Sequence, residues 1–321
     1  MSIQLIKNRS DIGAGTRGSD IGIDALEIAA INSGNDYFHR YDYVDVPTRN
    51  ETIYHKKTNT FAKRIKHVVE QCERVALAVQ TSHRSGHTPI VLSGDHSSAL
   101  GTISGIKAAF PDKQLGVIWI DAHSDIHSPY TSPSGNIHGM PLAAALAEDN
   151  LACQINHPEE NTIEQWERLK NIGCPGAKIA PEHVIYFGLR DFESAEEGLI
   201  AQKNIRVFTV AETREKTISV CVKTTKGLLA NCAIVYISFD VDSMDCDVVS
   251  HGTGTPVPGG FNPEEVKELL SQLIHTLPVC CLEVAEINPL LDTKGNFMAE
   301  TAFTIVDEAT QSLELRMNGA K

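Results

Sequence analysis

The chain has 321 residues, of which 42% are hydrophobic and 21% charged, and its 28 basic and 41 acidic side chains give a net charge of −13. This profile is typical of a folded, soluble protein, and the absence of a Lys/Arg block argues against a nucleic-acid partner, because neutralising phosphates requires clustered basic side chains. The most apolar stretch, Leu115 to Ile120, is far too short to span a bilayer, so no membrane association is expected.

Short Val- and Ile-rich runs alternate along the chain with longer segments of helical period, which predicts βα units around a mostly parallel sheet. Amphipathic helices that pack on this sheet are predicted over about Phe61 to Gln80, over Pro263 to Leu277 and around Ala302 to Leu313. Asn262 can cap the second of these helices, with Pro263 at its first position. Strands are predicted at Pro89 to Ser93, Leu115 to Ile120, Val184 to Gly188, Ile205 to Val210, Ile234 to Phe239 and Cys280 to Val284.

The chain carries no internal repeat, low-complexity tract or Pro/Gly/Ser linker that would divide it. Residues 1–321 are therefore interpreted as a single domain. The stretch Tyr37 to Asn59 mixes aromatic, charged and turn residues and is expected to be a surface excursion.

Four of the predicted strands end in a group of polar residues: SGDHS (93–97), DAHSD (121–125), FDVDSMD (239–245) and EVAEINP (283–289). In a parallel sheet the loops after the strands gather at one edge, so groups distant in sequence meet there. A functional site is therefore expected at that edge.

Aspartate and histidine alternate within two of these groups. Asp121, His123 and Asp125 are two residues apart, so an extended backbone points all three the same way, and Asp240 and Asp242 repeat the arrangement. A lone aspartate at a strand end is more often a turn or cap residue, and a lone histidine there can be a core imidazole. Two such clusters directly after apolar strands favour metal binding. The candidate ligands are His96, Asp121, His123, Asp125, Asp240 and Asp242.

Four carboxylates this close would repel one another unless a cation lay among them. Six ligands are too many for one catalytic ion with open positions, but they suit two ions that share carboxylates. Oxygen-rich coordination without a thiolate favours Mn²⁺. We predict that Asp121 and Asp240 bridge two Mn²⁺ ions. The other ligands would be His96 and Asp125 at one ion and His123 and Asp242 at the second.

Six segments together resemble, in order, the signature motifs of the arginase and agmatinase family of ureohydrolases. These segments are SGDHS, DAHSD, SGNIHG (134–139), SFDVDSMD (238–245), GTGTPVPGG (252–260) and AEINP (285–289). The resemblance implies a three-layer α/β/α fold with a central, mostly parallel sheet, a binuclear manganese centre and the same six ligands. It also implies hydrolysis of a guanidino group to urea and an amine, and a homo-oligomer, often a trimer or hexamer.

The resemblance also implies roles for individual residues. His138 is similar to the family's proton-shuttling histidine, and Glu286 to the glutamate that contacts the guanidinium. Asp125 would accept a hydrogen bond from the attacking group and pass its proton toward the leaving amine. These three residues are the predicted catalytic residues.

The SGNIHG segment resembles the arginase loop that holds an amino acid's α-carboxylate, which favours L-arginine as the substrate and L-ornithine as the amine product. Agmatine, guanidinobutyrate and formimidoylglutamate are the alternatives within the family. The predicted substrate contacts are His127, Ser134, Asn136, Asp191, Glu193 and Thr255.

Several positions depart from the family's pattern. Glu193 stands where an aspartate is usual, His127 where an asparagine is usual, and Ser93 replaces the first glycine of GGDHS. The loop after Asp242 has Cys246 in place of a proline and one extra residue. These changes bear on the choice of guanidino substrate more than on the type of reaction.

Two competing interpretations come from other classes of protein. GAGTRG (13–18), with Asp36 downstream, has the GxGxxG form of a dinucleotide-binding oxidoreductase, although no hydrophobic strand is predicted before it. A non-catalytic binding module is the other alternative, against which the complete ligand set argues. Eight cysteines are scattered without a CxxC pair, which predicts reduced thiols and a cytoplasmic location.

Overall fold

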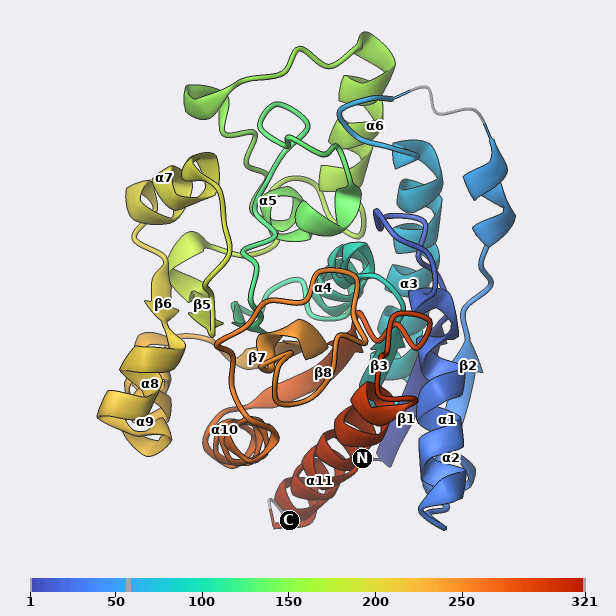
Figure 1. The fold of residues 1–321 in the computed structure, drawn as a ribbon. Coiled ribbons are helices and arrows are strands. Elements are labelled where there is room, and N and C mark those ends of the chain that lie inside the picture. Colours follow the sequence, from blue (N-terminus) through green and yellow to red (C-terminus); the bar gives the residue numbers. More distant parts are fainter. Residues whose placement is uncertain (1, 56–58, 320–321) are drawn as a thin grey trace.

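The computed structural model describes residues 2–55 and 59–319 (Figure 1). A sheet of eight strands forms its centre, in the order β2-β1-β3-β8-β7-β4-β5-β6, and all of its pairings are parallel. The strands are β1 (Ser2–Asn8), β2 (Asp42–Asp45), β3 (His87–Ser93), β4 (Leu115–Ile120), β5 (Val184–Phe187), β6 (Arg206–Phe208), β7 (Ile234–Asp240) and β8 (Val279–Ala285).

The six predicted strands are confirmed as β3 to β8, with small differences at their ends. Two strands were missing from the prediction. β1 pairs with β3 over its whole length, with Leu5 opposite Ile90. Within the predicted surface excursion over Tyr37 to Asn59, β2 is exposed along its length, as expected, but it also pairs with β1 as an edge strand that was not predicted. Residues 56–58 of that segment lie outside the described residues.

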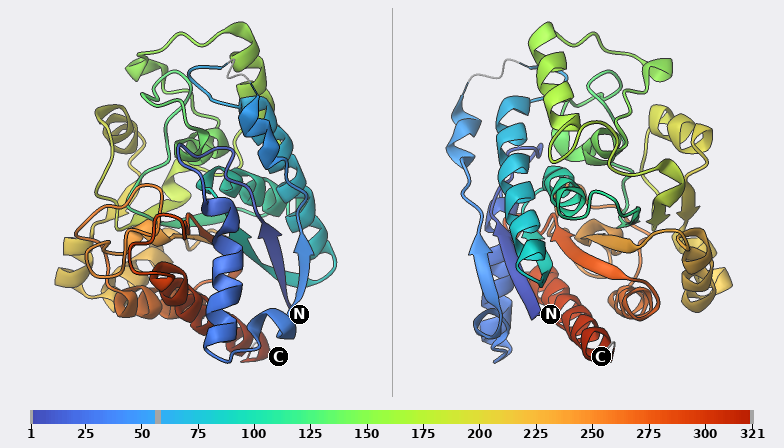
Figure 2. Two further views of the ribbon diagram at one scale, coloured as in Figure 1. Left: turned by 45° about the vertical axis from the view of Figure 1, so that its right-hand side comes forward. Right: turned by 180° about the vertical axis from the view of Figure 1, so that it is seen from behind.

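Helices cover both faces of the sheet and give the three layers expected (Figure 2). One face is covered by α1 (Gly22–Asn32), α9 (Ile218–Leu228), α10 (Pro263–Thr276) and α11 (Phe297–Gly319). The other is covered by α3 (Ile65–Arg84), α4 (Ala99–Ala109), α5 (Pro141–Leu146) and α6 (Glu160–Lys170). The shorter helices are α2 (Tyr37–Arg40), α7 (Ser194–Gln202) and α8 (Val210–Lys216).

Each face of the sheet has its own hydrophobic core. In β4, Ile118 and Ile120 point into the core shared with α10 and α11, whereas Val117 and Trp119 point into the core shared with α3 and α4. A central parallel strand is buried on both sides, which explains why β4 is a continuous apolar run.

The predicted start of α10 is confirmed in detail. The Asn262 side chain accepts a hydrogen bond from the Glu265 amide (2.9 Å), and the Glu265 carboxylate accepts one from the Asn262 amide (2.8 Å). Pro263 occupies the first turn. α3 begins at Ile65, later than predicted, because Arg64 adopts a left-handed backbone conformation (φ 60°).

The strand order places the predicted polar groups side by side. β3, β8, β7 and β4 are consecutive in the sheet, so the four segments that follow them share one edge, with the end of β5 next to them. The long loop from β7 to α10, orange in Figure 1, lies at the same edge. No helix within the described ranges has the length and apolar character needed to cross a bilayer.

Candidate metal centre and active site

A cavity of about 140 Å³ opens at this edge of the sheet. Five of the six predicted metal ligands line it, and the sixth, Asp121, is fully buried beneath it. All three predicted catalytic residues also line the cavity, as do four of the six predicted substrate contacts. The lining residues with titratable or hydroxyl side chains are His96, His123, Asp125, His127, His138, Asp191, Glu193, Glu196, Asp240, Asp242, Thr255 and Glu286.

His96 is at the centre of the first group of candidate ligands. Its Nδ1 atom lies 3.1 Å from a carboxylate oxygen of Asp121, 2.9 Å from one of Asp125 and 3.0 Å from one of Asp240. The opposite ring nitrogen, Nε2, is 2.7 Å from the Ser238 hydroxyl. This contact directs Nδ1 toward the three carboxylates.

His123 is at the centre of the second group. Its Nδ1 atom lies 2.9 Å from a carboxylate oxygen of Asp242 and 3.6 Å from one of Asp121. Asp121 therefore reaches both imidazoles, one with each of its oxygens. The two groups of potential ligand atoms, His96, Asp121 and Asp240, and Asp121, His123 and Asp242, each fit within 4.8 Å.

Backbone amides hold one oxygen of each of three carboxylates. The second oxygens of Asp121 and Asp240 face His96, and that of Asp242 faces His123. The His123 amide donates to Asp121 Oδ1 (2.7 Å), the Asp242 amide to Asp240 Oδ1 (2.8 Å), and the Ala122 amide to Asp242 Oδ1 (3.2 Å). Thr255 donates its hydroxyl to the second oxygen of Asp242 (3.1 Å). The period-two spacing of the sequence is thus combined with tight turns that fix the acids.

The donor set fits divalent cations. His96 Nδ1 and Asp121 Oδ2 are both buried and make no hydrogen bond of acceptable geometry. Burial, and then the neighbouring Asp121 carboxylate, raises the pKa of Asp125 to about 6, and burial together with adjacent carboxylates also raises the pKa of Asp240. Adjacent buried carboxylates with raised pKa values cannot all ionise unless a cation neutralises them. Such carboxylates next to ligand atoms without hydrogen bonds are therefore expected at a metal site.

Two residues of the site adopt backbone conformations that are rare for side chains other than glycine. Asp125 has a φ of 51° and Glu286 a φ of 68°. Such conformations persist only where the surrounding structure enforces them, and they cluster at functional sites. In both segments the unusual backbone conformation therefore places the side chain, Asp125 or Glu286, at the site.

Glu286 and His138 form a buried pair at the wall of the cavity. His138 Nδ1 lies 3.2 Å from Glu286 Oε1, which also accepts a hydrogen bond from the His96 amide (2.9 Å). Burial lowers the pKa of His138, but the adjacent Glu286 carboxylate outweighs this effect and raises the pKa to about 9. Burial alone would raise the pKa of Glu286, but the interaction with His138 lowers it. The pair is therefore a carboxylate beside a protonated imidazole at neutral pH.

Comparisons with known proteins identify the family of this chain. The sequence profile described as Arginase family matches residues 2–311. The chain belongs to the arginase family. Arginase from Bacillus caldovelox is 34% identical over 303 residues, which span 91% of this chain and 93% of that protein. Arginase from Brevibacillus brevis is 36% identical over 92% of this chain and 93% of its own length. The solved structure of the B. caldovelox arginase superposes with a TM-score of 0.83, covering 96% of this chain and 98% of that chain.

Arg190 is a residue of this arginase-family site that sequence reasoning missed. Its guanidinium donates hydrogen bonds to the main-chain carbonyls of Asp242 and Val257, both at 2.7 Å. Longer bonds reach the carbonyls of Gly188, Ser243, Met244 and Pro258. Arg190 thus ties the end of β5 to the loop that carries Asp242 and Thr255. Its sequence signal is its place in GLRDFE (188–193), directly before the predicted substrate contacts Asp191 and Glu193.

The end of the cavity away from the Glu286 pair is acidic. His127 Nε2 lies 2.8 Å from Glu193 Oε2 and 3.4 Å from Glu196 Oε2, and its Nδ1 is 3.0 Å from the Thr131 hydroxyl. Burial, and then Glu193, raises the pKa of Glu196 to about 8, whereas burial lowers the pKa of His127. Asp191 lies on the same side, 3.6 Å from His123 Nε2.

Glu196 was also absent from the predicted site. It is 4% exposed and forms a capping box with Glu193 at the start of α7. The Glu-x-x-Glu spacing of that box is a sequence signal for two acids on one turn.

Ser134 and Asn136, the predicted carboxylate contacts, do not line the cavity. The exposed Ser134 accepts a hydrogen bond from the Asn136 amide (3.1 Å), and the Asn136 side chain accepts one from Lys63 (3.2 Å). They lie on the SGNIHG loop four and two residues before His138, outside the enclosed volume.

The GAGTRG segment packs against the arginase-family motifs. It does follow a strand, β1, contrary to the prediction, but a Cβ added at Gly13 would lie 2.4 Å from Ser97 Oγ, and one at Gly15 would lie 2.6 Å from Asn136 Nδ2. The Gly13 amide donates to Asp95 (2.8 Å). The first two glycines of the segment are thus used for close packing within the protein.

Proposed function

We propose that this protein hydrolyses the guanidino group of L-arginine to urea and L-ornithine, with two Mn²⁺ ions as cofactor. The observation that carries the proposal is the convergence of four carboxylates and two imidazoles on one cavity, with buried ligand atoms that lack partners. Membership of the arginase family supports the reaction type, that of a metal-dependent amidinohydrolase.

The six residues predicted from the sequence are proposed as the metal ligands. Asp121 would be shared between the ions, because it belongs to both groups of potential ligand atoms, and Asp240, which belongs to the first group, is proposed as the second shared ligand. His96 and Asp125 would complete one set, and His123 and Asp242 the other. Oxygen-rich donors with no thiolate suit Mn²⁺. When bound, the two ions lower the pKa of water and so supply the nucleophile at neutral pH.

Glu286 is proposed to hold the guanidinium. Its carboxylate stays ionised, and while Oε1 is engaged by His96 and His138, no hydrogen bond from the described residues occupies Oε2. A planar cation can therefore donate charge-assisted hydrogen bonds to that oxygen. This contact would orient the guanidinium carbon toward the metal ligands.

Proton transfer is assigned to two residues that line the cavity. Asp125, whose pKa is raised to about 6, is proposed to accept a proton from the attacking water. Asp125 would then pass this proton toward the leaving amine, while His138, whose pKa is raised to about 9, holds a proton at neutral pH that it can exchange with solvent.

The acidic end of the cavity supports a substrate with a second positive charge. Glu193 and Asp191 are proposed to attract the α-ammonium group of arginine, with Glu196 and His127 holding Glu193 in place. Agmatine also carries a second cation, so these acids alone do not separate the two substrates. We propose that the α-carboxylate of arginine is bound at the mouth of the cavity by Ser134 and Asn136, and that Thr255 acts by fixing Asp242.

Urea release tests this proposal directly. We expect manganese-dependent urea release from L-arginine that exceeds release from agmatine and guanidinobutyrate. Asp121→Asn should abolish it, whereas Asp112→Asn, at an exposed turn, should leave it unchanged. Release from agmatine or guanidinobutyrate but not from arginine would contradict the substrate, and full activity of Asp121→Asn would contradict the metal ligands.

We further propose that residues 1–321 act as one domain, in the cytoplasm, as a homo-oligomer of the trimeric or hexameric kind. All eight cysteines are free, which supports a reducing compartment. Light scattering coupled to size exclusion would give the mass of the assembly, and a monomer would contradict the proposal.

A further inference from the structure

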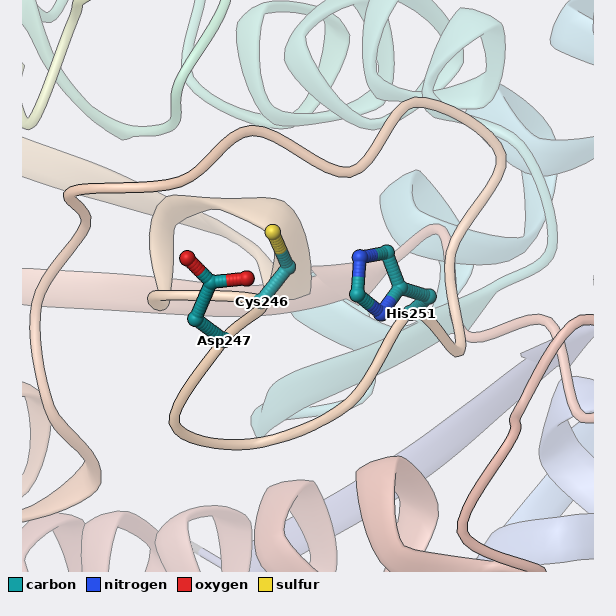
Figure 3. Close-up of side chains that lie close together, drawn as sticks. All are labelled: Cys246, Asp247 and His251. Carbon is teal, nitrogen blue, oxygen red and sulfur yellow. The ribbon is translucent and has the colours of Figure 1, made fainter.

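The loop between β7 and α10 carries three potential metal ligands outside the cavity. Cys246, Asp247 and His251 each offer one ligand atom, and these three atoms lie within 4.8 Å of one another. In Figure 3 the Cys246 sulfur lies between the Asp247 carboxylate and the His251 ring. None of the three residues lines the cavity of the candidate active site. The group is therefore separate from the six ligands discussed above.

The three side chains are not engaged elsewhere. In the ranges that the structure describes, the thiol, the carboxylate and the imidazole make no hydrogen bond or ion pair with another residue; Asp247 is bonded only through its amide. Cys246 is just 4% exposed, whereas Asp247 and His251 are exposed. A buried thiol thus points toward two ligands that are open to solvent.

The backbone of this loop is already fixed. The amides of Val248 and Val249 donate to the Asp245 carbonyl (3.1 and 2.9 Å), and the Asp247 amide donates to the Asp245 side chain (3.1 Å). Lys294 donates to the Val249 carbonyl (2.6 Å). Because the chain is held at these points, the three ligand atoms are presented from a fixed backbone.

The electrostatic surroundings of the thiol also favour a cation. Burial, and then the carboxylates of Asp247 and Asp245, raises the pKa of Cys246. A divalent ion would reverse this effect, because it stabilises the thiolate and neutralises the adjacent carboxylate.

We propose that Cys246, Asp247 and His251 bind one zinc-class divalent ion, with water as its fourth ligand. Thiolate, imidazole and carboxylate together suit Zn²⁺, which takes four tetrahedral ligands, whereas Mn²⁺ prefers oxygen. The site therefore differs in metal preference from the binuclear centre. Cys246 stands where the family's pattern has a proline, so its thiolate is not part of that pattern.

An ion at this position acts on the active-site loop. The same loop continues to Thr255, which donates to Asp242, and to Val257, whose carbonyl accepts from Arg190. Joining Cys246 to His251 restricts the conformations of the loop ahead of these contacts. Occupancy should therefore alter the rate of the reaction without supplying a reacting group.

Cobalt absorption separates this site from the manganese centre. We would titrate Co²⁺ into the manganese-loaded full-length protein and record the near-ultraviolet charge-transfer band that only thiolate-bound Co²⁺ gives. The expected result is a band that saturates at one Co²⁺ per chain and is removed by Zn²⁺ but not by Mn²⁺. Exchange of Co²⁺ into the binuclear centre gives no such band, because that centre contains no thiolate.

Variants make the outcome decisive. Cys246→Ser should lose the band, His251→Gln should weaken Co²⁺ binding at least ~10-fold (about 1.4 kcal/mol), and the control Cys153→Ser should keep it. His251 is exposed, so its variant tests the site even if Cys246→Ser folds poorly. Absence of the band in the parent protein, its persistence in Cys246→Ser, or unchanged Co²⁺ affinity in His251→Gln would overturn the proposal.

Discussion

Replacing Arg190 by lysine tests whether the loop after β7 is held by a single side chain. The guanidinium donates to six main-chain carbonyls, and the two shortest bonds, to Asp242 and Val257, measure 2.7 Å. Lysine keeps the positive charge but has three donors around one nitrogen instead of a planar fork of five. It cannot span carbonyls that belong to two separate segments of the chain.

The cost can be worked from these bonds. A hydrogen bond to a charged group contributes about 1.5–3 kcal/mol net, so losing the two shortest lowers the free energy of unfolding by ~3 kcal/mol at the lower bound. With an unfolding entropy of about 2.1 cal/mol/K per residue over 321 residues, the thermal midpoint of Arg190→Lys should fall by about 4 °C. Affinity for Mn²⁺ should fall ~10-fold, because Asp242 and Thr255 depend on the same loop.

The assay is differential scanning calorimetry together with a manganese titration. Arg168→Lys is the matched control, because Arg168 makes a bidentate pair with Glu73 but both side chains are exposed by 40% or more. That surface pair is worth less than ~1 kcal/mol. Equal midpoints for the two variants, or unchanged manganese affinity in Arg190→Lys, would refute the assigned role of Arg190.

Three further predictions concern the metal, proton transfer and pH. Manganese at 100 times its dissociation constant should stabilise the protein by about 2.7 kcal/mol per site, or ~8 °C in thermal midpoint for two sites, and no shift would contradict metal binding. His138→Asn should lower kcat by ~100-fold or more with manganese affinity retained, and a parallel loss of manganese would point to a structural role instead. Burial lowers the pKa of Lys178 from 10.5 to about 8, so between these two pH values the unfolded chain binds more protons than the folded one. The contribution of Lys178 to the free energy of unfolding should therefore rise with pH over that range. Denaturant titrations should show that gain in the parent protein but not in Lys178→Met.

The sequence by itself predicted the class of fold, which the structure confirms, and the candidate ligands of the proposed metal centre. A strand buried on both faces must be apolar throughout, so Leu115–Ile120 could be recognised from composition alone. Asp121, His123 and Asp125 put two carboxylates and one imidazole within five residues directly after a strand, which is a local property of the sequence. Both features follow from residues that are neighbours in the chain.

Local sequence patterns did not predict the strands that form only by pairing with another strand distant in sequence. β1 contains Lys7 and β2 is exposed on every residue, and each was found only through pairing with strands distant in sequence. Arg190 and Glu196 entered the site in the same way, because β5 and its following loop lie next to β4 in the sheet. Ser134 is exposed outside the cavity, so its proposed contact with the substrate stays a prediction.

The order of the strands was decided by tertiary structure alone. Nothing in the segments after β3 and β4 states that β8 and β7 insert between them, yet that insertion brings His96, Asp121 and Asp240 within contact of one another. Strand pairing depends on how whole faces of apolar side chains pack against the helices. The free energy of this packing is a sum over residues that are far apart in the chain. Sequence thus specified which groups could bind metal, and packing decided which of them meet.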